Sequence, residues 1–181
     1  MVDRSHARVL ILPGLGDSGP QHWQTLWERQ NAGFARVEQR DWERPRYEDW
    51  AANLERAVAA AGPDMVLAAH SLACLLVARW AHETKLRIKG ALLVAPPDPD
   101  AITFPEDAVG FAPIPDRALP FPAIVVASTD DPYGDVAFAR ASARIWGARF
   151  VEVTDAGHIN ADSGFGPWND GLALLRSLAD A

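Results

Sequence analysis

Ser71 lies at a place in the sequence where a nucleophilic hydroxyl could be exposed. The apolar run 65–69 ends just before it, and a second apolar run with helical character begins just after it. A serine on such a sharp strand-to-helix turn exposes its hydroxyl, and the first N–H groups of the helix face the reacting carbonyl. Ala69 and Ala73 occupy the two places where this turn usually has glycine. Ser71 could equally be the N-cap of a buried helix, which is a common role for serine.

A serine hydroxyl becomes a strong nucleophile only when a base removes its proton and an acid orients that base. Asp131 and His158 follow Ser71 in the chain order Ser, Asp, His that is typical of α/β-hydrolases. Of the five histidines, only His158 follows the last predicted strand, where the base is expected. Asp131 is preferred to Asp130 because Pro132 pushes the residue before it into an extended conformation. The sequence therefore predicts a catalytic triad of Ser71, Asp131 and His158.

The substrate oxygen that gains negative charge needs two preorganised N–H donors, one from the residue after the nucleophile and one from the loop after an early strand. Leu72 is predicted to supply the first donor. Leu15 is predicted to supply the second, because the glycines on either side of it allow that loop to approach Ser71 closely. Trp23 and Trp168 are predicted to contact the substrate, with ordinary core packing as an equal alternative for both.

A different motif covers residues 14–19, which read Gly-x-Gly-x-x-Gly between a predicted strand and a predicted helix. This is the dinucleotide-binding fingerprint, and Glu38 or Asp41 could serve as its ribose-binding acid about twenty residues on. Against it, Pro20 follows the last glycine directly, and tryptophans occupy the helix that should pack closely on a pyrophosphate. A dinucleotide-binding oxidoreductase therefore stays as the alternative to a hydrolase.

Composition excludes several other functions. The net charge of −7 argues against a nucleic-acid partner, because such binding needs clustered Lys and Arg. Cys74 is the single cysteine, so no internal disulfide can form, and a cytoplasmic location is expected. No His and carboxylate cluster has metal-ligand spacing, so neither a metal nor another cofactor is predicted. No apolar run is long enough to span a bilayer, so no membrane association is expected.

Alternating strands and helices position these residues. Near-continuous apolar strands of this kind are buried on both faces of a parallel sheet, with helices on both sides. Strands are predicted at 8–12, 36–40, 65–69, 88–95, 123–128 and 149–154, and helices at 20–27, 47–61, 72–83, 136–146 and 167–178. The fold class is therefore α/β, with three layers and about six mostly parallel strands in one domain over 1–181. In such sheets ligands bind at the carboxyl ends of the strands, where Ser71, Asp131 and His158 all fall.

Three segments of the sequence, 69–74, 128–133 and 155–160, resemble segments of the small serine hydrolases described as retinoblastoma-binding-protein-like. Segments 20–24 and 163–168 are similar to two further segments of the same family. The resemblance covers nearly the whole chain. It implies a capless α/β-hydrolase fold with Ser71, Asp131 and His158 as its triad. Leu76 replaces the glutamate of the Leu-x-Cys-x-Glu sequence that some animal relatives use to bind pocket proteins, so no such partner is expected.

The predicted function is hydrolysis of a small ester, thioester or amide through an acyl-enzyme, in the manner of a carboxylesterase. A non-catalytic binding protein on the same scaffold is the further alternative. The proline-rich stretch 96–122 shows no sustained helical pattern, so it is expected to form a rim around a shallow pocket instead of a lid.

Overall fold

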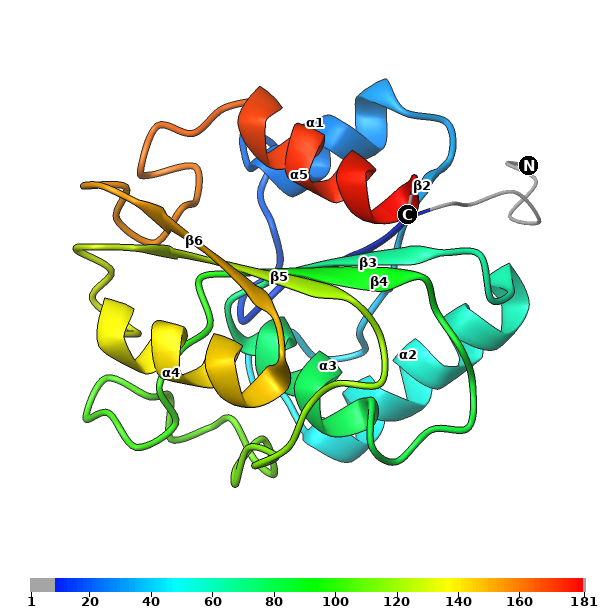
Figure 1. Cartoon of the computed structure of the whole chain (residues 1–181), viewed down its shortest axis with the longest axis horizontal. Helices are drawn as coiled ribbons and strands as arrows, with labels where there is room; N and C mark the ends of the chain where they lie inside the picture. Colours follow the sequence, from blue (N-terminus) through cyan, green and yellow to red (C-terminus); the bar gives the residue numbers. More distant parts are fainter. Residues whose placement is uncertain (1–8, 181) are drawn as a thin grey trace.

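The computed structural model describes residues 9–180, and over these residues the chain forms one six-stranded sheet with helices on both faces (Figure 1). Arg8, the predicted start of the first strand, and His6 lie outside the described residues. The strand order is β2-β1-β3-β4-β5-β6, and every neighbouring pair is parallel. The strands are β1 (Val9–Leu12), β2 (Phe34–Arg36), β3 (Val66–His70), β4 (Gly90–Val94), β5 (Ala123–Ser128) and β6 (Arg149–Val153).

Helices cover both faces of the sheet, as Figure 1 shows. The helices are α1 (Trp23–Gln30), α2 (Tyr47–Ala61), α3 (Leu72–Trp80), α4 (Val136–Trp146) and α5 (Asn169–Ala179). Buried side chains of α1 and α5 form one apolar cluster with one face of the strands, and those of α2, α3 and α4 form the other cluster with the opposite face. The predicted three-layer α/β fold is therefore confirmed.

Parallel pairing brings the carboxyl ends of the strands to one edge of the sheet. Strand β3 lies at the centre of this edge, between β1 and β4, and its last residue His70 pairs with Val94. All residues of β1, β3, β4 and β5 are buried, which explains their continuous apolar sequences. Segments that follow β1, β3, β5 and β6 therefore meet above this edge.

Several predicted boundaries were wrong by a few residues. Helix α1 begins at Trp23 and not at residue 20, because the His22 side chain accepts the Gln24 N–H and caps the helix there. Strand β2 lies at Phe34–Arg36, earlier than the predicted 36–40. Helix α3 ends at Trp80, before the predicted residue 83. The ends of α2, α4 and β5 match the prediction.

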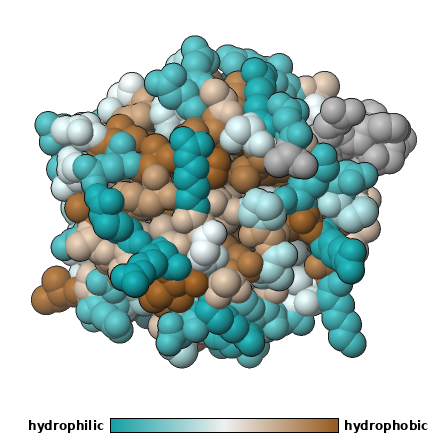
Figure 2. Space-filling model, viewed as in Figure 1, coloured by the Kyte–Doolittle hydropathy of each residue, from teal (hydrophilic) through white to brown (hydrophobic). Residues whose placement is uncertain are grey.

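The stretch 96–122 contains neither a helix nor a named strand in the described structure. It contacts the start of α2 through a β-bridge between Arg46 and Val109 and a hydrogen bond from the Tyr47 N–H to the Val109 carbonyl oxygen. Phe111 is fully buried and anchors this stretch to the core. In the view of Figure 2, hydrophilic side chains lie mainly around the rim, and hydrophobic groups are exposed toward the middle and at a few places in the helical layers. No helix among the described residues is both long and apolar enough to cross a membrane.

Candidate active site

Ser71 occupies a strained turn between β3 and α3. Its φ of 55° and ψ of −124° are unusual for a residue with a side chain, and such strain concentrates at functional sites. Ala69 and Ala73, on either side of the turn, are fully buried. Gly14 lies against the turn so closely that a Cβ there would be 3.0 Å from Ser71 Cβ and from the His70 carbonyl oxygen. A side chain at position 14 would therefore crowd the turn.

The Ser71 hydroxyl makes no capping hydrogen bond to helix α3, although Ser71 is its N-cap residue. Instead, Ser71 Oγ lies 2.9 Å from His158 Nε2. The alternative of a simple capping serine is therefore wrong. The hydroxyl is directed away from the helix and toward the imidazole.

Asp131 lies behind the same imidazole. Its two carboxylate oxygens are 2.9 and 3.0 Å from His158 Nδ1, and one of them also accepts the N–H of Tyr133. The Asp131 side chain is only 1% exposed and that of His158 is 11% exposed. With Nδ1–H donating to the carboxylate, the lone pair of Nε2 is left to accept the Ser71 hydroxyl proton.

Asp130 has a different set of partners. Its Oδ1 accepts the Ser128 hydroxyl at 2.6 Å and the Gly157 N–H at 2.7 Å. These hydrogen bonds, led by that from Ser128, lower the pKa of the Asp130 carboxyl. Asp130 thus ties the end of β5 to the loop that carries His158 and does not contact the imidazole itself.

The predicted backbone donors lie beside Ser71. Leu15 and Leu72 line the same pocket as Ser71 and His158. The Leu72 N–H belongs to the first residue of α3, and the first N–H groups of a helix have no partner within it. A Cβ on Gly14 would lie 3.4 Å from the Leu72 nitrogen, so the loop carrying Leu15 reaches the start of α3.

The pocket in front of Ser71 has a volume of about 230 Å³. The expected rim is present, because the stretch 96–122 contributes Pro97, Thr103 and Pro105 to its lining. Tyr133 and Asn160 also line it, and the Tyr133 ring packs edge-on against the His158 ring, with centroids 4.7 Å apart. The sequence reasoning assigned no role to Tyr133 or Asn160. The one sequence feature that could have indicated a role in the pocket is that each lies two residues after a predicted triad member, Asp131 or His158.

Trp23 does not contact this pocket, so the predicted substrate contact is wrong for this residue. Its side chain is fully buried, and its indole N–H donates to the Ile159 carbonyl oxygen at 2.8 Å. Ile159 has a φ of 48°, which is strained for a β-branched residue. Trp23 therefore helps to hold the strained segment between His158 and Asn160.

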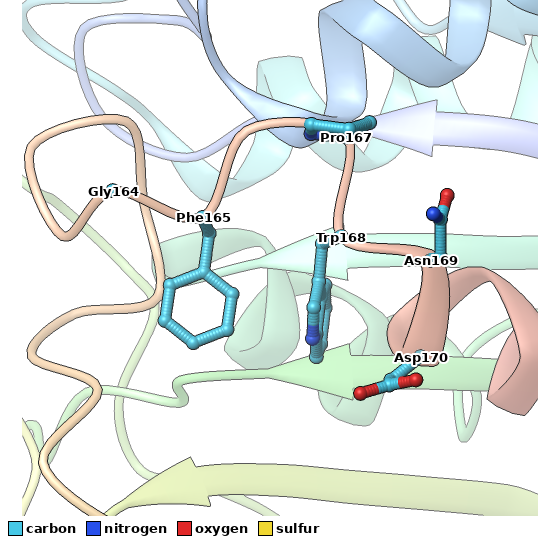
Figure 3. Close-up of a pocket in the computed structure, with 6 residues that line it drawn as sticks. All are labelled: Gly164, Phe165, Pro167, Trp168, Asn169 and Asp170. Carbon is cyan, nitrogen blue, oxygen red and sulfur yellow. The ribbon is translucent and has the colours of Figure 1, made fainter.

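Trp168 is also misassigned as a substrate contact. It lines a separate, open hollow of about 470 Å³ together with Phe165 and the first residues of α5. Figure 3 shows Phe165 and Trp168 pointing in the same direction from their loop. The Trp168 ring packs against the rings of Trp23 and Trp27, which both belong to α1.

Two further histidines lie behind His158. His70 Nε2 is 2.8 Å from the His158 carbonyl oxygen, and the His22 ring packs edge-on against the His70 ring. Burial, together with the charges of His158 and Arg36, lowers the pKa of His22 to about 4. Burial also lowers the pKa of His70 far below its usual value. Both rings are therefore neutral near neutral pH.

The remaining nucleophile, Cys74, is fully buried in α3. Its thiol donates to the Val94 carbonyl oxygen, and burial raises its pKa well above the usual value. Thiolate chemistry is disfavoured at such a site. No group of three or more His, Cys, Asp or Glu side chains within residues 9–180 could hold a metal ion.

The glycine-rich loop 14–19 is arranged differently from a dinucleotide site. Residues 20–22 separate it from α1, and the Gln24 N–H at the start of that helix is already bound by His22. Arg36 forms ion pairs with Asp17 and Glu28 beside the loop. Gly14 of this loop packs against Ser71 instead. That packing involves neither Glu38 nor Asp41, the two candidate ribose-binding acids.

Comparison with known proteins shows the family and the fold of this chain. The family model described as serine hydrolase matches residues 9–177. A protein described as a YdeN-like hydrolase from Pectobacterium atrosepticum is 31% identical, with a TM-score of 0.85 over 95% of this chain and 90% of that one. No curated protein matches the sequence significantly.

Two more distant structures share the fold. The ydeN gene product from B. subtilis is 24% identical, with a TM-score of 0.77 over 96% of this chain and 98% of that one. A monoacylglycerol lipase from Paleococcus ferrophilus is 13% identical, with a TM-score of 0.71 over 95% of this chain and 93% of that one.

Proposed function

Because this chain belongs to the serine hydrolase family, we propose that it cleaves a small ester, thioester or amide through an acyl-enzyme on Ser71. The observation that carries the proposal is the 2.9 Å contact between Ser71 Oγ and His158 Nε2 at a strained strand-to-helix turn. A capping serine would bond the helix N–H groups, whereas this hydroxyl is bound to a base. The proposed roles are nucleophile for Ser71, general base for His158 and orienting acid for Asp131.

In the acylation step, His158 Nε2 takes the Ser71 proton as Oγ forms a bond to the carbonyl carbon of the substrate. The carbonyl oxygen becomes an oxyanion, and we assign its stabilisation to the backbone N–H groups of Leu15 and Leu72. The tetrahedral intermediate then collapses. The bond to the leaving group breaks, and the imidazolium returns its proton to that group.

Deacylation repeats these steps with water. His158 removes a proton from the water as its oxygen attacks the acyl carbon, and the Ser71 oxygen leaves and recovers the proton from the imidazolium. The carboxylic acid is released and Ser71 is free again. Throughout, the Asp131 carboxylate keeps the Nδ1 proton in place and stabilises the positive charge on the ring.

The pocket supports a small substrate. Its volume of about 230 Å³ lies below the roughly 300–1,000 Å³ typical of drug-sized ligand sites. Apolar side chains of Leu15, Leu72, Pro97 and Pro105 line much of it, which suits a short acyl group. A carboxylesterase-type activity on a small-molecule ester is therefore favoured, with neither nucleic acid nor membrane as partner.

Two finer assignments belong to the same proposal. Within the family, the blocks around Ser71, Asp131 and His158 support a place among the retinoblastoma-binding-protein-like members. A cytoplasmic location fits a chain whose single cysteine can form no internal disulfide.

Hydrolysis of p-nitrophenyl acetate, followed from the first turnover, tests the proposal. An acyl-enzyme predicts an initial burst of nitrophenolate, stoichiometric with enzyme where deacylation is the slower step, and steady turnover after it. The Ser71→Ala variant should fold and show neither phase. Steady turnover by this variant at the wild-type rate would overturn the proposal. Absence of turnover by the wild type with ester, thioester and amide alike would favour the non-catalytic alternative.

A further inference from the structure

The loop after β6 delivers two polar side chains to the pocket, not one. His158 and Asn160 both line it, and Ile159 between them points the other way and is fully buried. The left-handed conformation of Ile159, at φ 48°, allows this arrangement. Such strain persists only where the surroundings fix it, and here the Trp23 indole N–H and the buried Ile159 side chain do so. The position of Asn160 is therefore held by the core.

The orientation of the Asn160 amide is fixed as well. Its Oδ1 accepts the backbone N–H of Ser163 at 3.0 Å and the Ser163 hydroxyl at 2.9 Å. A backbone N–H can only donate, so the atom facing Ser163 must be the amide oxygen. The Nδ2 group, which carries two hydrogens, has no hydrogen-bond partner among residues 9–180. The side chain therefore keeps two unused donors, on a residue that lines the pocket.

We propose that Asn160 is a specificity-determining residue whose Nδ2–H group donates a hydrogen bond to an acceptor oxygen of the substrate. The substrate class is then a small ester, thioester or amide that carries an ether, hydroxyl or carbonyl oxygen in addition to the scissile group. This inference rests on the proposed function, because it assigns a substrate contact in the pocket of Ser71. It adds a polar requirement to a pocket whose lining also includes the apolar side chains of two leucines and two prolines.

The extra oxygen could lie on the acyl side or on the alcohol side of the scissile bond. Two pairs of esters that differ only by an oxygen in place of a methylene separate these cases. On the acyl side, p-nitrophenyl methoxyacetate is compared with p-nitrophenyl butyrate. On the alcohol side, 2-methoxyethyl acetate is compared with butyl acetate. Each pair is matched in chain length.

The measured quantity is the ratio of kcat/KM within each pair, for the wild type and for two variants. Asn160→Asp keeps the acceptor for Ser163 and loses the donor, whereas Asn160→Ala loses both. Comparing each ratio with that of the wild type cancels the intrinsic reactivity of the esters. Asp162→Ala, at an exposed position of the same loop, is the matched control.

In one of the two pairs, the preference for the oxygen-containing ester should fall roughly three- to ten-fold in both Asn160 variants, the effect expected for one neutral hydrogen bond. The pair that responds identifies the side of the scissile bond. The Asp162→Ala ratios should equal those of the wild type. Because ratios are compared, a general loss of activity in a variant leaves the test intact.

Unchanged ratios in both pairs for both variants would overturn the assignment of Asn160, and continued turnover by the wild type would leave the proposed function standing. An equal fall in the Asp162→Ala control would also overturn it, since the effect would then belong to the loop as a whole. Turnover that persists in Ser71→Ala would instead defeat the proposed function. The two failures are therefore distinguishable.

Discussion

The Asp131 carboxylate faces His158 Nδ1 with both oxygens, at 2.9 and 3.0 Å, across 27 residues of sequence. Its neighbour Asp130 contacts Ser128 and the Gly157 N–H instead. Two adjacent carboxylates at the end of β5 therefore have separate tasks. One orients an imidazole, and the other fastens the loop from which that imidazole projects.

The first prediction compares the two carboxylates. Asp131→Asn should lower kcat on the order of 10⁴-fold, the loss known for the serine-protease triad, because an amide cannot hold the Nδ1 proton in the required tautomer. Asp130→Asn should cost far less, because its amide oxygen can still accept the Gly157 N–H. Steady-state kinetics with p-nitrophenyl acetate measure both. Equal losses, or a larger loss in Asp130→Asn, would reverse the assignment.

The second prediction concerns acyl chain length. A pocket of about 230 Å³ can bury few methylenes, and each buried methylene is worth about 0.8 kcal/mol, roughly four-fold in kcat/KM. Values for p-nitrophenyl esters should therefore stop rising near butyrate and should be lower for octanoate and palmitate. A four-fold rise per methylene that continues through octanoate would show a deep apolar pocket in place of the shallow one.

The third prediction concerns acid stability. The pKa of His22 is about 4 in the folded protein, against an ordinary value of 6.5. Between these pH values the unfolded chain binds more protons than the folded one, so the free energy of unfolding should fall as pH decreases from about 7 to about 4. At pH values above about 7, this difference in pKa contributes about 3 kcal/mol to the free energy of unfolding. The buried His70 acts in the same direction.

His22→Asn tests this account by urea denaturation across the same pH range. Asparagine can still accept the Gln24 N–H as a helix cap, but it carries no titrating group. The variant should be less stable at neutral pH, because a buried ring is lost, and its stability should decline less steeply on acidification. Parallel curves for the two proteins would mean that His22 does not contribute to the pH dependence.

The sequence predicted the architecture well, because the apolar runs of the central strands are long and both of their faces are buried. The meeting of Ser71, Asp131 and His158 also followed from sequence, since residues at the carboxyl ends of parallel strands share one edge of the sheet. Helix α1 was placed too early because proline suits the first turn of a helix, which favoured a start at Pro20. The histidine cap at His22 has no comparable sequence signal.

The aromatic residues show what sequence does not settle. A tryptophan near the glycine-rich loop could face the pocket or the core, and only tertiary packing decides. Trp23 packs in the core, where its indole N–H donates a hydrogen bond to the Ile159 carbonyl oxygen. Asn160 was missed because its position depends on the left-handed backbone of Ile159, which is unexpected for a β-branched residue.

The fourth prediction addresses the central claim, that Ser71 is an activated nucleophile. A fluorophosphonate probe reacts covalently with serines whose hydroxyl is deprotonated by a neighbouring base, as the contact between Ser71 Oγ and His158 Nε2 implies. After labelling and proteolysis, mass spectrometry should find one adduct per chain, on Ser71, and no adduct in the folded Ser71→Ala variant. An adduct on another serine, labelling that survives in Ser71→Ala, or an unlabelled wild-type protein would contradict the account.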